Sequence, residues 1–250
     1  LPNSEMSHPA YVKKFGIVFI DSPILQNHST LGTDSVVERT RYAIATNSMP
    51  VEEFKRAFLF GWAVQAFHSL GLTQDISVYL NQNGVRYKAF YDGLLSENPD
   101  TIAGREVAAT RDSLEKVLTD PNRGQWGKVD GIYGNIVWPY EEFSFLNIIT
   151  GDRELFYGQT RDMIRRNFGI DLPREIVEKQ ISRLVTPEDF GGNIGEYAKR
   201  IVWFGRKSGA TFKDNRKILE DSVDSNNTNN QAGSGPVERP RSTLLPIISS

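Results

Sequence analysis

Two polar side chains in the most apolar stretch of the sequence could take part in chemistry. Gln65 and His68 lie three residues apart, a spacing that places both on one face of a helix. Because an amide and an imidazole can each hydrogen-bond a substrate or a cofactor, we take both as candidate pocket-facing groups. The simpler alternative is a buried pair whose polar atoms are satisfied by the backbone or by each other. The sequence leaves both interpretations open.

A second candidate site is a basic segment that follows two aromatic residues. Arg206 and Lys207 come directly after Trp203, Phe204 and Gly205. Two cations beside aromatic rings could hold a phosphate, a carboxylate or the acidic surface of a partner, so they are candidate anion-binding residues. The alternative is the end of a helix, where cations and a glycine stop are common.

Paired acidic residues are a third pattern, and we assign them no chemistry. Glu52-Glu53 and Glu141-Glu142 each open an expected helix. Adjacent residues of a helix point in different directions, and the helix dipole favours acids in a first turn. We expect Glu52 to pair instead with Arg56, four residues later on the exposed face.

Composition excludes several classes of function. The 250 residues are 39% hydrophobic and 24% charged, which suits one globular domain or two small ones. The net charge is −2, so no global basic field exists for nucleic acid or an anionic membrane. Cysteine is absent, which excludes disulfides, a cysteine nucleophile and thiolate-held metal or iron–sulfur sites within these residues. The three histidines are far apart in sequence, which disfavours a histidine metal site.

The sequence shows neither a membrane span nor a signal peptide. No apolar run reaches the length of about 18 residues that a membrane helix needs. The first residues lack the apolar region of a secretory signal. The chain begins with Leu1 rather than Met, so we expect a processed or trimmed product or a piece of a longer chain. The expected compartment is the cytoplasm.

A long apolar helix over residues 50–72 would position Gln65 and His68. Phe54, Phe58 and Trp62 recur every four residues, and further apolar side chains flank them. A helix that is apolar on nearly every face is expected to be buried within a larger core. We therefore predict a mainly α fold with a few short strands (α+β), packed round one buried central helix.

Turn and cap residues divide the rest of the chain into three parts. Residues 1–46 predict a short helix at 9–15, capped by Ser7, and short strands at 17–20 and 36–46. Residues 47–215 predict a helical domain, in which a glycine- and tryptophan-rich segment at 120–138 interrupts the helices. Residues 216–250 predict a disordered tail, because they become rich in Ser, Asn, Gln, Gly and Pro.

Several stretches, in their order and spacing, resemble cobalamin-binding radical SAM proteins over roughly residues 1–210. They are Leu1-Pro2-Asn3 with Glu5-Met6-Ser7, the helix-to-strand step Tyr11 to Ile17, Thr46-Asn47-Ser48-Met49-Pro50, the helix Lys55 to His68, Tyr87 to Tyr91, Trp126-Gly127, Trp138 to Glu142 and Trp203 to Lys207. In that family the first of these stretches leaves the last strand of the barrel. The resemblance thus implies that residues 1–46 leave a barrel this chain lacks, and that the helical domain is the C-terminal region.

The family's cofactors are implied only for the full-length enzyme. Its members have a cobalamin domain and a barrel whose Cys-x-x-x-Cys-x-x-Cys motif holds a 4Fe-4S cluster that binds S-adenosylmethionine. This chain departs from the family decisively, because it has no cysteine. No catalytic, cofactor-binding or metal-binding residue is therefore carried over. The implied partners are the missing barrel and cobalamin domain and a small-molecule substrate, with no nucleic acid and no membrane.

Two functions follow, and they differ in the surface they require. The first is a C-terminal fragment of a cobalamin-dependent radical SAM enzyme, of methyltransferase or rearrangement type, that closes or shapes the substrate pocket without the cluster-binding core. The alternative is a stand-alone helical interaction module with no catalysis. A fragment should expose apolar surface where the barrel was, whereas a self-sufficient module should cover its own core.

Overall fold

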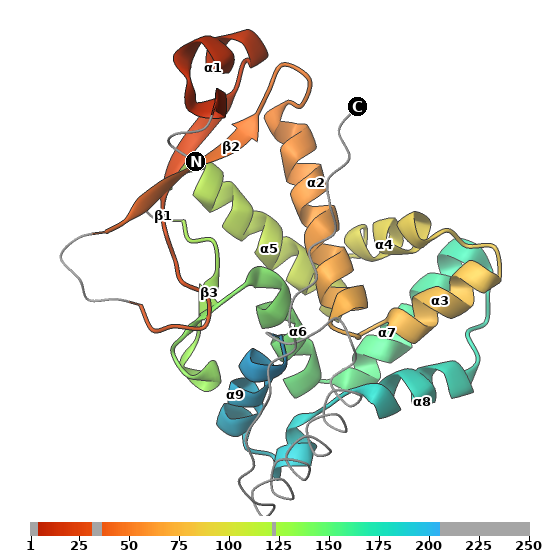
Figure 1. The fold of residues 1–250 in the computed structure, drawn as a ribbon. Helices are drawn as coiled ribbons and strands as arrows, with labels where there is room; N and C mark the ends of the chain where they lie inside the picture. The colour runs from red at the N-terminus through yellow and green to blue at the C-terminus, as the bar shows by residue number, and fades with distance from the viewer. Residues whose placement is uncertain (1–4, 32–36, 122–123, 206–250) are drawn as a thin grey trace, which may run out of the picture.

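The computed structural model describes residues 5–31, 37–121 and 124–205 (Figure 1). In these ranges helices dominate and the strands form two short antiparallel pairs, which confirms the predicted mainly α fold. The predicted tail at 216–250 lies outside the described residues. The helices are α1 (Pro9–Phe15), α2 (Val51–Ala63), η2 (Val64–Ser69), α3 (Gln74–Gln82), α4 (Tyr87–Leu95), α5 (Ile102–Thr119), α6 (Tyr140–Thr150), α7 (Arg153–Phe168), α8 (Arg174–Arg183) and α9 (Ile194–Gly205), with 3-10 turns η1 (Glu5–Ser7), η3 (Gly131–Tyr133) and η4 (Pro187–Phe190).

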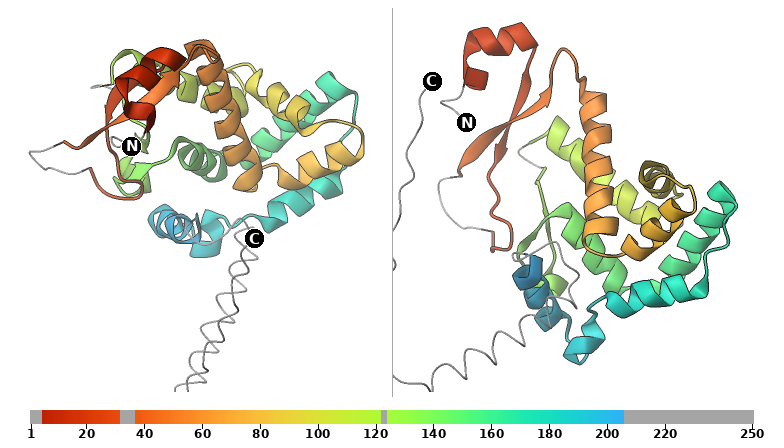
Figure 2. Two further views of the ribbon diagram at one scale, coloured as in Figure 1. Left: turned by 45° about the horizontal axis from the view of Figure 1, so that its top comes forward. Right: turned by 45° about the vertical axis from the view of Figure 1, so that its right-hand side comes forward.

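The described residues from 5 to 45 form an N-terminal arm. The helix α1 has the predicted bounds, but its N-cap is His8 rather than Ser7: the Nδ1 atom of His8 accepts a hydrogen bond from the Ala10 amide at 3.3 Å. Strand β1 (Val18–Pro23) then pairs antiparallel with β2 (Arg39–Ala45), so β1 begins one residue later and extends further than predicted. Figures 1 and 2 show the arm standing to one side of the helical body.

The predicted central helix is two segments, and one face of it is exposed. The α-helix α2 continues into η2, a π-helical segment that carries Gln65 and His68. Trp62 and Phe67 are buried, as expected. Helices α4, α5 and α6 pack against α2, as expected for a central helix, whereas the stripe Ala57, Gly61 and Gln65 is exposed. This stripe is a line of small and polar residues spaced four apart, which lies between the large side chains on which the prediction rested.

The first turn of α2 also pairs its charges differently from the prediction. Arg56 binds Glu53, three residues earlier, and not Glu52. Lys55 contacts Glu52 at 2.9 Å and Glu115 of α5 at 2.7 Å. The pairing between α2 and α5 is a tertiary contact that helical spacing could not reveal.

The hydrophobic core belongs to the helical body rather than to the arm. Its buried members run from Trp62 to Ala198, and none of the described residues before Phe58 belongs to the core or to its partly buried margin. The helix α6 contacts α2, η2, α5 and α7, and it contributes the fully enclosed Phe145 and Leu146. Helix α3 packs against α4 and α8 on the side of the body away from the arm (Figure 1). The body therefore has a core of its own.

A second strand pair lies where the glycine-rich segment was predicted. Strand β3 (Lys128–Val129) pairs antiparallel with β4 (Val137–Trp138), just before α6. The helix α9 then packs on η3 and η4. Within the described ranges, no helix combines the length and the apolar character needed to cross a membrane.

Candidate functional site

The two predicted pocket-facing residues have different surroundings. Gln65 is exposed, whereas His68 is half-buried and its Nδ1 atom lies 2.8 Å from the Tyr91 hydroxyl and 3.1 Å from the Ser77 hydroxyl. Burial lowers the pKa of His68, so the neutral imidazole is favoured. The edge of Tyr87 lies beside the imidazole ring. Neither Gln65 nor His68 lines the two cavities described below, and their pocket-facing role remains a prediction.

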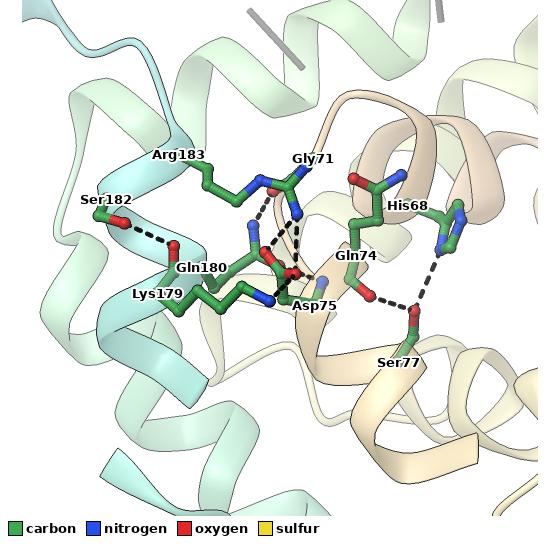
Figure 3. A network of polar contacts seen from close by, with 9 residues as sticks. All are labelled: His68, Gly71, Gln74, Asp75, Ser77, Lys179, Gln180, Ser182 and Arg183. Atoms are coloured by element: carbon green, nitrogen blue, oxygen red, sulfur yellow. Dashed lines mark hydrogen bonds and ion pairs between the residues drawn. The ribbon is translucent and has the colours of Figure 1, made fainter. Parts of the chain in front are cut away.

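Near His68 lies a set of polar residues that we call the α3–α8 cluster. It consists of Asp75 of α3 with Lys179, Gln180 and Arg183 of α8. Figure 3 shows Asp75 facing the two cations, with Gln180 beside Gly71. Arg183 donates to both carboxylate oxygens of Asp75, at 2.8 and 3.0 Å, and Lys179 lies 3.2 Å from one of them.

Gln180 completes this cluster from within the protein, since only 1% of the residue is exposed. Its side-chain oxygen accepts from the Asp75 amide at 2.7 Å, and its side-chain nitrogen donates to the Gly71 carbonyl. A buried backbone group without a partner is costly, so Gln180 ties the end of the central helix to α8. This arrangement is structural.

A histidine from the arm reaches the helical body at α6. His28 has a positive φ of 63°, and its Nε2 atom lies 2.6 Å from a carboxylate oxygen of Glu142. Its ring meets the edge of Trp138, and its amide donates to the Val137 carbonyl at 2.7 Å. The sequence analysis did not predict this pair, because the two residues are 114 positions apart and His28 lies between the predicted strands at 17–20 and 36–46.

A third polar region surrounds a cavity of about 240 Å³, which we call the lysine cavity. It lies between the C-terminal half of α5 and the chain that leads into β3. Its walls are formed by Ser113, Lys116, Gly124, Gln125, Gly127, Lys128, Val129 and Tyr140. The Nζ atom of Lys128 donates to the Ser113 hydroxyl at 2.5 Å and lies 5.9 Å from the centre of the Tyr140 ring.

Glycines bring one wall of the lysine cavity close to its neighbours. A Cβ atom on Gly124 would lie 2.4 Å from backbone atoms of Val117 in α5, and one on Gly127 would lie 2.8 Å from the Trp138 carbonyl oxygen. The Tyr140 hydroxyl donates to the Gln125 carbonyl. The segment from Gly124 to Gly127 is therefore held by close packing at both ends.

The same wall also contacts the arm. The Trp126 ring lies 5.1 Å from that of Tyr42 in β2 and 5.7 Å from that of Phe58 in α2. The indole nitrogen of Trp126 is buried without a hydrogen-bond partner in the described structure. The lysine cavity thus opens in a region where the arm and the helical body meet.

Glu106 of α5 is a half-buried acid whose charge acts on Lys128. The side-chain amide of Asn147 donates to its two carboxylate oxygens at 3.1 and 3.4 Å. Burial raises the pKa of Glu106, and hydrogen bonds from Ser144 and Asn147 oppose that shift. Burial lowers the pKa of Lys128, and the charge of Lys116 lowers it further.

A larger cavity of about 690 Å³ lies along the arm. It is lined by Pro23, Ile24, Leu25, Gln26, Ser29, Thr30, Leu31, Val37, Glu38 and Val137. The candidate anion-binding residues Arg206 and Lys207 lie outside the described residues. Among the described residues, no group of three His, Asp or Glu side chains could hold a metal ion.

Comparison with known proteins places the chain near one class of enzyme. No protein-family model matches it. It is distantly similar to cobalamin-dependent radical SAM methyltransferases. Over 109 residues it is 30% identical to the cobalamin-dependent radical SAM methyltransferase TokK of Streptomyces tokunonensis, which is 42% of this chain and 16% of that protein.

The second relative matches more of the chain. Over 197 residues the identity is 29% to the 2-(S-pantetheinyl)-carbapenam-3-carboxylate methyltransferase of Streptantibioticus cattleyicolor. That alignment covers 68% of this chain and 27% of the relative. The chain therefore spans less than a third of the length of the curated relatives it matches.

Proposed function

We propose that this chain forms a helical region of a cobalamin-dependent radical SAM methyltransferase, where it packs against the cofactor-bearing parts and helps to close and shape the substrate pocket. The observation that carries the proposal is the 29% identity over 197 residues to a methyltransferase whose name gives a small carbapenam carboxylate as its substrate. A small organic molecule is accordingly the substrate class. A closed pocket excludes water from reactive chemistry.

The surface of the arm supports the proposal. Ten large hydrophobic residues are exposed among those the structure describes, and six of them lie on the arm. The six are Met6, Phe15, Val18, Ile24, Leu31 and Val37. Exposed apolar side chains concentrated in one segment are typical of an interaction surface, and the arm contributes nothing to the main core. The missing barrel of the parent enzyme would cover this surface.

The 4Fe-4S cluster does not fit residues of this chain. It contains no cysteine, so the thiolates that hold a 4Fe-4S cluster would have to come from elsewhere in the enzyme. No step of the methyl transfer is therefore assigned to these residues. Their role is to bind, to enclose and to exclude water.

The coding sequence before Leu1 and the behaviour of the arm test this proposal together. We expect a Cys-x-x-x-Cys-x-x-Cys motif roughly 150–200 residues earlier, about the length of a barrel. Hydrogen exchange should then show the amides of α1 and the exposed edges of the arm protected in the full-length protein and open in the present chain. Equal exchange in both proteins, or no such motif, would favour the stand-alone interaction module.

The pocket-facing role of His68 has a separate test in the full-length protein. His68→Ala should lower methyl transfer more than Gln82→Ala, a substitution at an exposed position on α3. Both variants should be compared at matched folded concentration, because His68 also bonds Tyr91 and Ser77. Unchanged turnover by folded His68→Ala would remove His68 from the pocket and leave the proposed family role intact.

A further inference from the structure

The lysine cavity contains two ammonium groups that lack acidic partners. Lys55, Lys88, Lys179 and Lys199 each contact a carboxylate. Lys116 and Lys128 form no ion pair with any described residue, although both line the cavity. Two cations that share a cavity without a counter-ion repel each other, and an anion between them would relieve that repulsion.

The hydrogen bonds around Lys128 leave capacity for a ligand. The Ser113 hydroxyl donates to the Ala109 carbonyl at 2.7 Å, so its oxygen accepts from Lys128 and it has no proton to offer a ligand. The Tyr140 ring attracts the ammonium group from a second side. An ammonium group has three N–H donors, and the described residues provide Lys128 with a single hydrogen-bond acceptor, the Ser113 oxygen.

The charges around the cavity favour one class of anion. Two acidic residues of α5, Glu106 and Asp112, act on Lys128 through their charge. They offset part of the charge of Lys116 and Lys128. The positive charge that remains is less than that of two cations, so a singly charged carboxylate would neutralise it without the excess negative charge of a doubly charged phosphate.

The walls suit a small organic body attached to the charged group. The Tyr140 ring and Val129 offer apolar surface beside Lys128, and the close packing of Gly124 and Gly127 fixes the wall that carries Lys128. A volume of about 240 Å³ accommodates a few carbon atoms with their carboxylate. A preformed site of this kind binds without having to order its own walls.

We propose that the lysine cavity binds the carboxylate of a small organic acid between Lys116 and Lys128. The binding itself requires only the described cavity. The identity of the acid as substrate rests on the proposed function, since one relative acts on a carboxylate. Because Trp126 links this wall to the arm, an occupied cavity would lie beside the surface that faces the rest of the enzyme.

Titration of the present chain with propionate tests the site directly. Lysine side chains labelled with ¹³C are followed by NMR at constant ionic strength, so that screening by salt does not change. We expect the Lys128 signal to shift saturably and the pKa of its amine to rise, because a bound carboxylate stabilises the ammonium form. Propionamide, a neutral molecule of nearly the same shape, should cause no shift.

Substitutions then separate specific binding from general charge effects. Lys128→Met and Lys116→Gln should each weaken propionate binding by about tenfold or more, the worth of one charge-assisted hydrogen bond. Lys199→Gln removes an exposed, ion-paired lysine and should change nothing. Having two cavity variants keeps the test decisive if one of them fails to fold.

Three results would overturn the assignment. These are an equal response to propionamide, propionate binding that survives both cavity substitutions, and tighter binding of inorganic phosphate than of propionate. None of them bears on protection of the arm in the full-length protein. Failure of this inference is therefore distinguishable from failure of the proposed function.

Discussion

The α3–α8 cluster and the lysine cavity both contain lysine side chains, but the charged groups of the cluster are paired and those of the cavity have no ion pair with a described residue. In the α3–α8 cluster, Asp75 is matched by two cations and Gln180 satisfies two backbone groups. In the lysine cavity, Lys116 and Lys128 lack a matching acid in the described structure and border an open space. A fully paired group stabilises the fold, whereas unpaired charge beside a cavity is available to a ligand. Completeness of pairing distinguishes the two roles better than residue type does.

The largest effect should come from breaking the complete cluster. Gln180→Leu removes the partners of the Asp75 amide and the Gly71 carbonyl while keeping the side chain bulky. We expect a loss of about 2–4 kcal/mol in the free energy of unfolding, because each buried unpaired group costs roughly 1–3 kcal/mol. Urea unfolding measures it.

Gln82→Leu is the matched control for that substitution. Gln82 is exposed at the end of α3, and the same exchange there should change stability by no more than about 0.5 kcal/mol. If the two variants lost equal stability, the hydrogen bonds of Gln180 would not be what stabilises the contact between the central helix and α8.

An intermediate effect is expected at the wall of the lysine cavity. In Gly127→Ala the new methyl group would lie 2.8 Å from the Trp138 carbonyl oxygen and 2.9 Å from a Val137 methyl carbon. Overpacking of this kind costs about 1–3 kcal/mol. The variant should also weaken propionate binding, because the wall that carries Lys128 must move.

Gly158→Ala provides the contrast. Gly158 lies in α7 with open space round its Cβ position, so alanine should raise stability by about 0.5–1 kcal/mol. Thermal unfolding would compare the two variants in one experiment. A stabilising Gly127→Ala would contradict the close approach between that glycine and β4.

Local features of the sequence were enough for most of the helices. Pro139 and Thr101 are the N-caps of α6 and α5, and Gly16 ends α1 in the left-handed conformation that favours glycine. Such signals act within a few residues. The exposed stripe through Gly61 escaped prediction, because a small residue on a helix gives no indication of what packs over it.

The candidate sites were harder to predict, since they depend on long-range contacts. His28 and Glu142 are 114 residues apart, and Asp75 and Arg183 are 108 apart. Nothing in the sequence distinguishes Lys128, because a single lysine in a glycine-rich segment is typical of an ordinary loop. The fold distinguishes it from such a loop residue, because Lys128 and Lys116 line the same cavity.

The smallest effect is a pH dependence that reports the charge of Lys128. Its pKa is lowered in the folded protein, so between that value and the ordinary 10.5 the unfolded chain binds more protons. Stability therefore rises with pH through this window. Subtracting the free energy of unfolding of Lys128→Met from that of the wild-type protein isolates this contribution, and the difference should increase as pH rises.

Adding propionate tests whether this pH dependence responds to a bound carboxylate. A bound carboxylate holds Lys128 in the ammonium form, which raises its pKa and should flatten the increase of the difference with pH. Propionamide should leave that increase in place. If the difference in free energy of unfolding between the wild-type protein and Lys128→Met fell as pH rose, the protein alone would stabilise Lys128 as an ammonium group. The lysine cavity would then be a complete cluster like the one between α3 and α8, with nothing left for a ligand to neutralise.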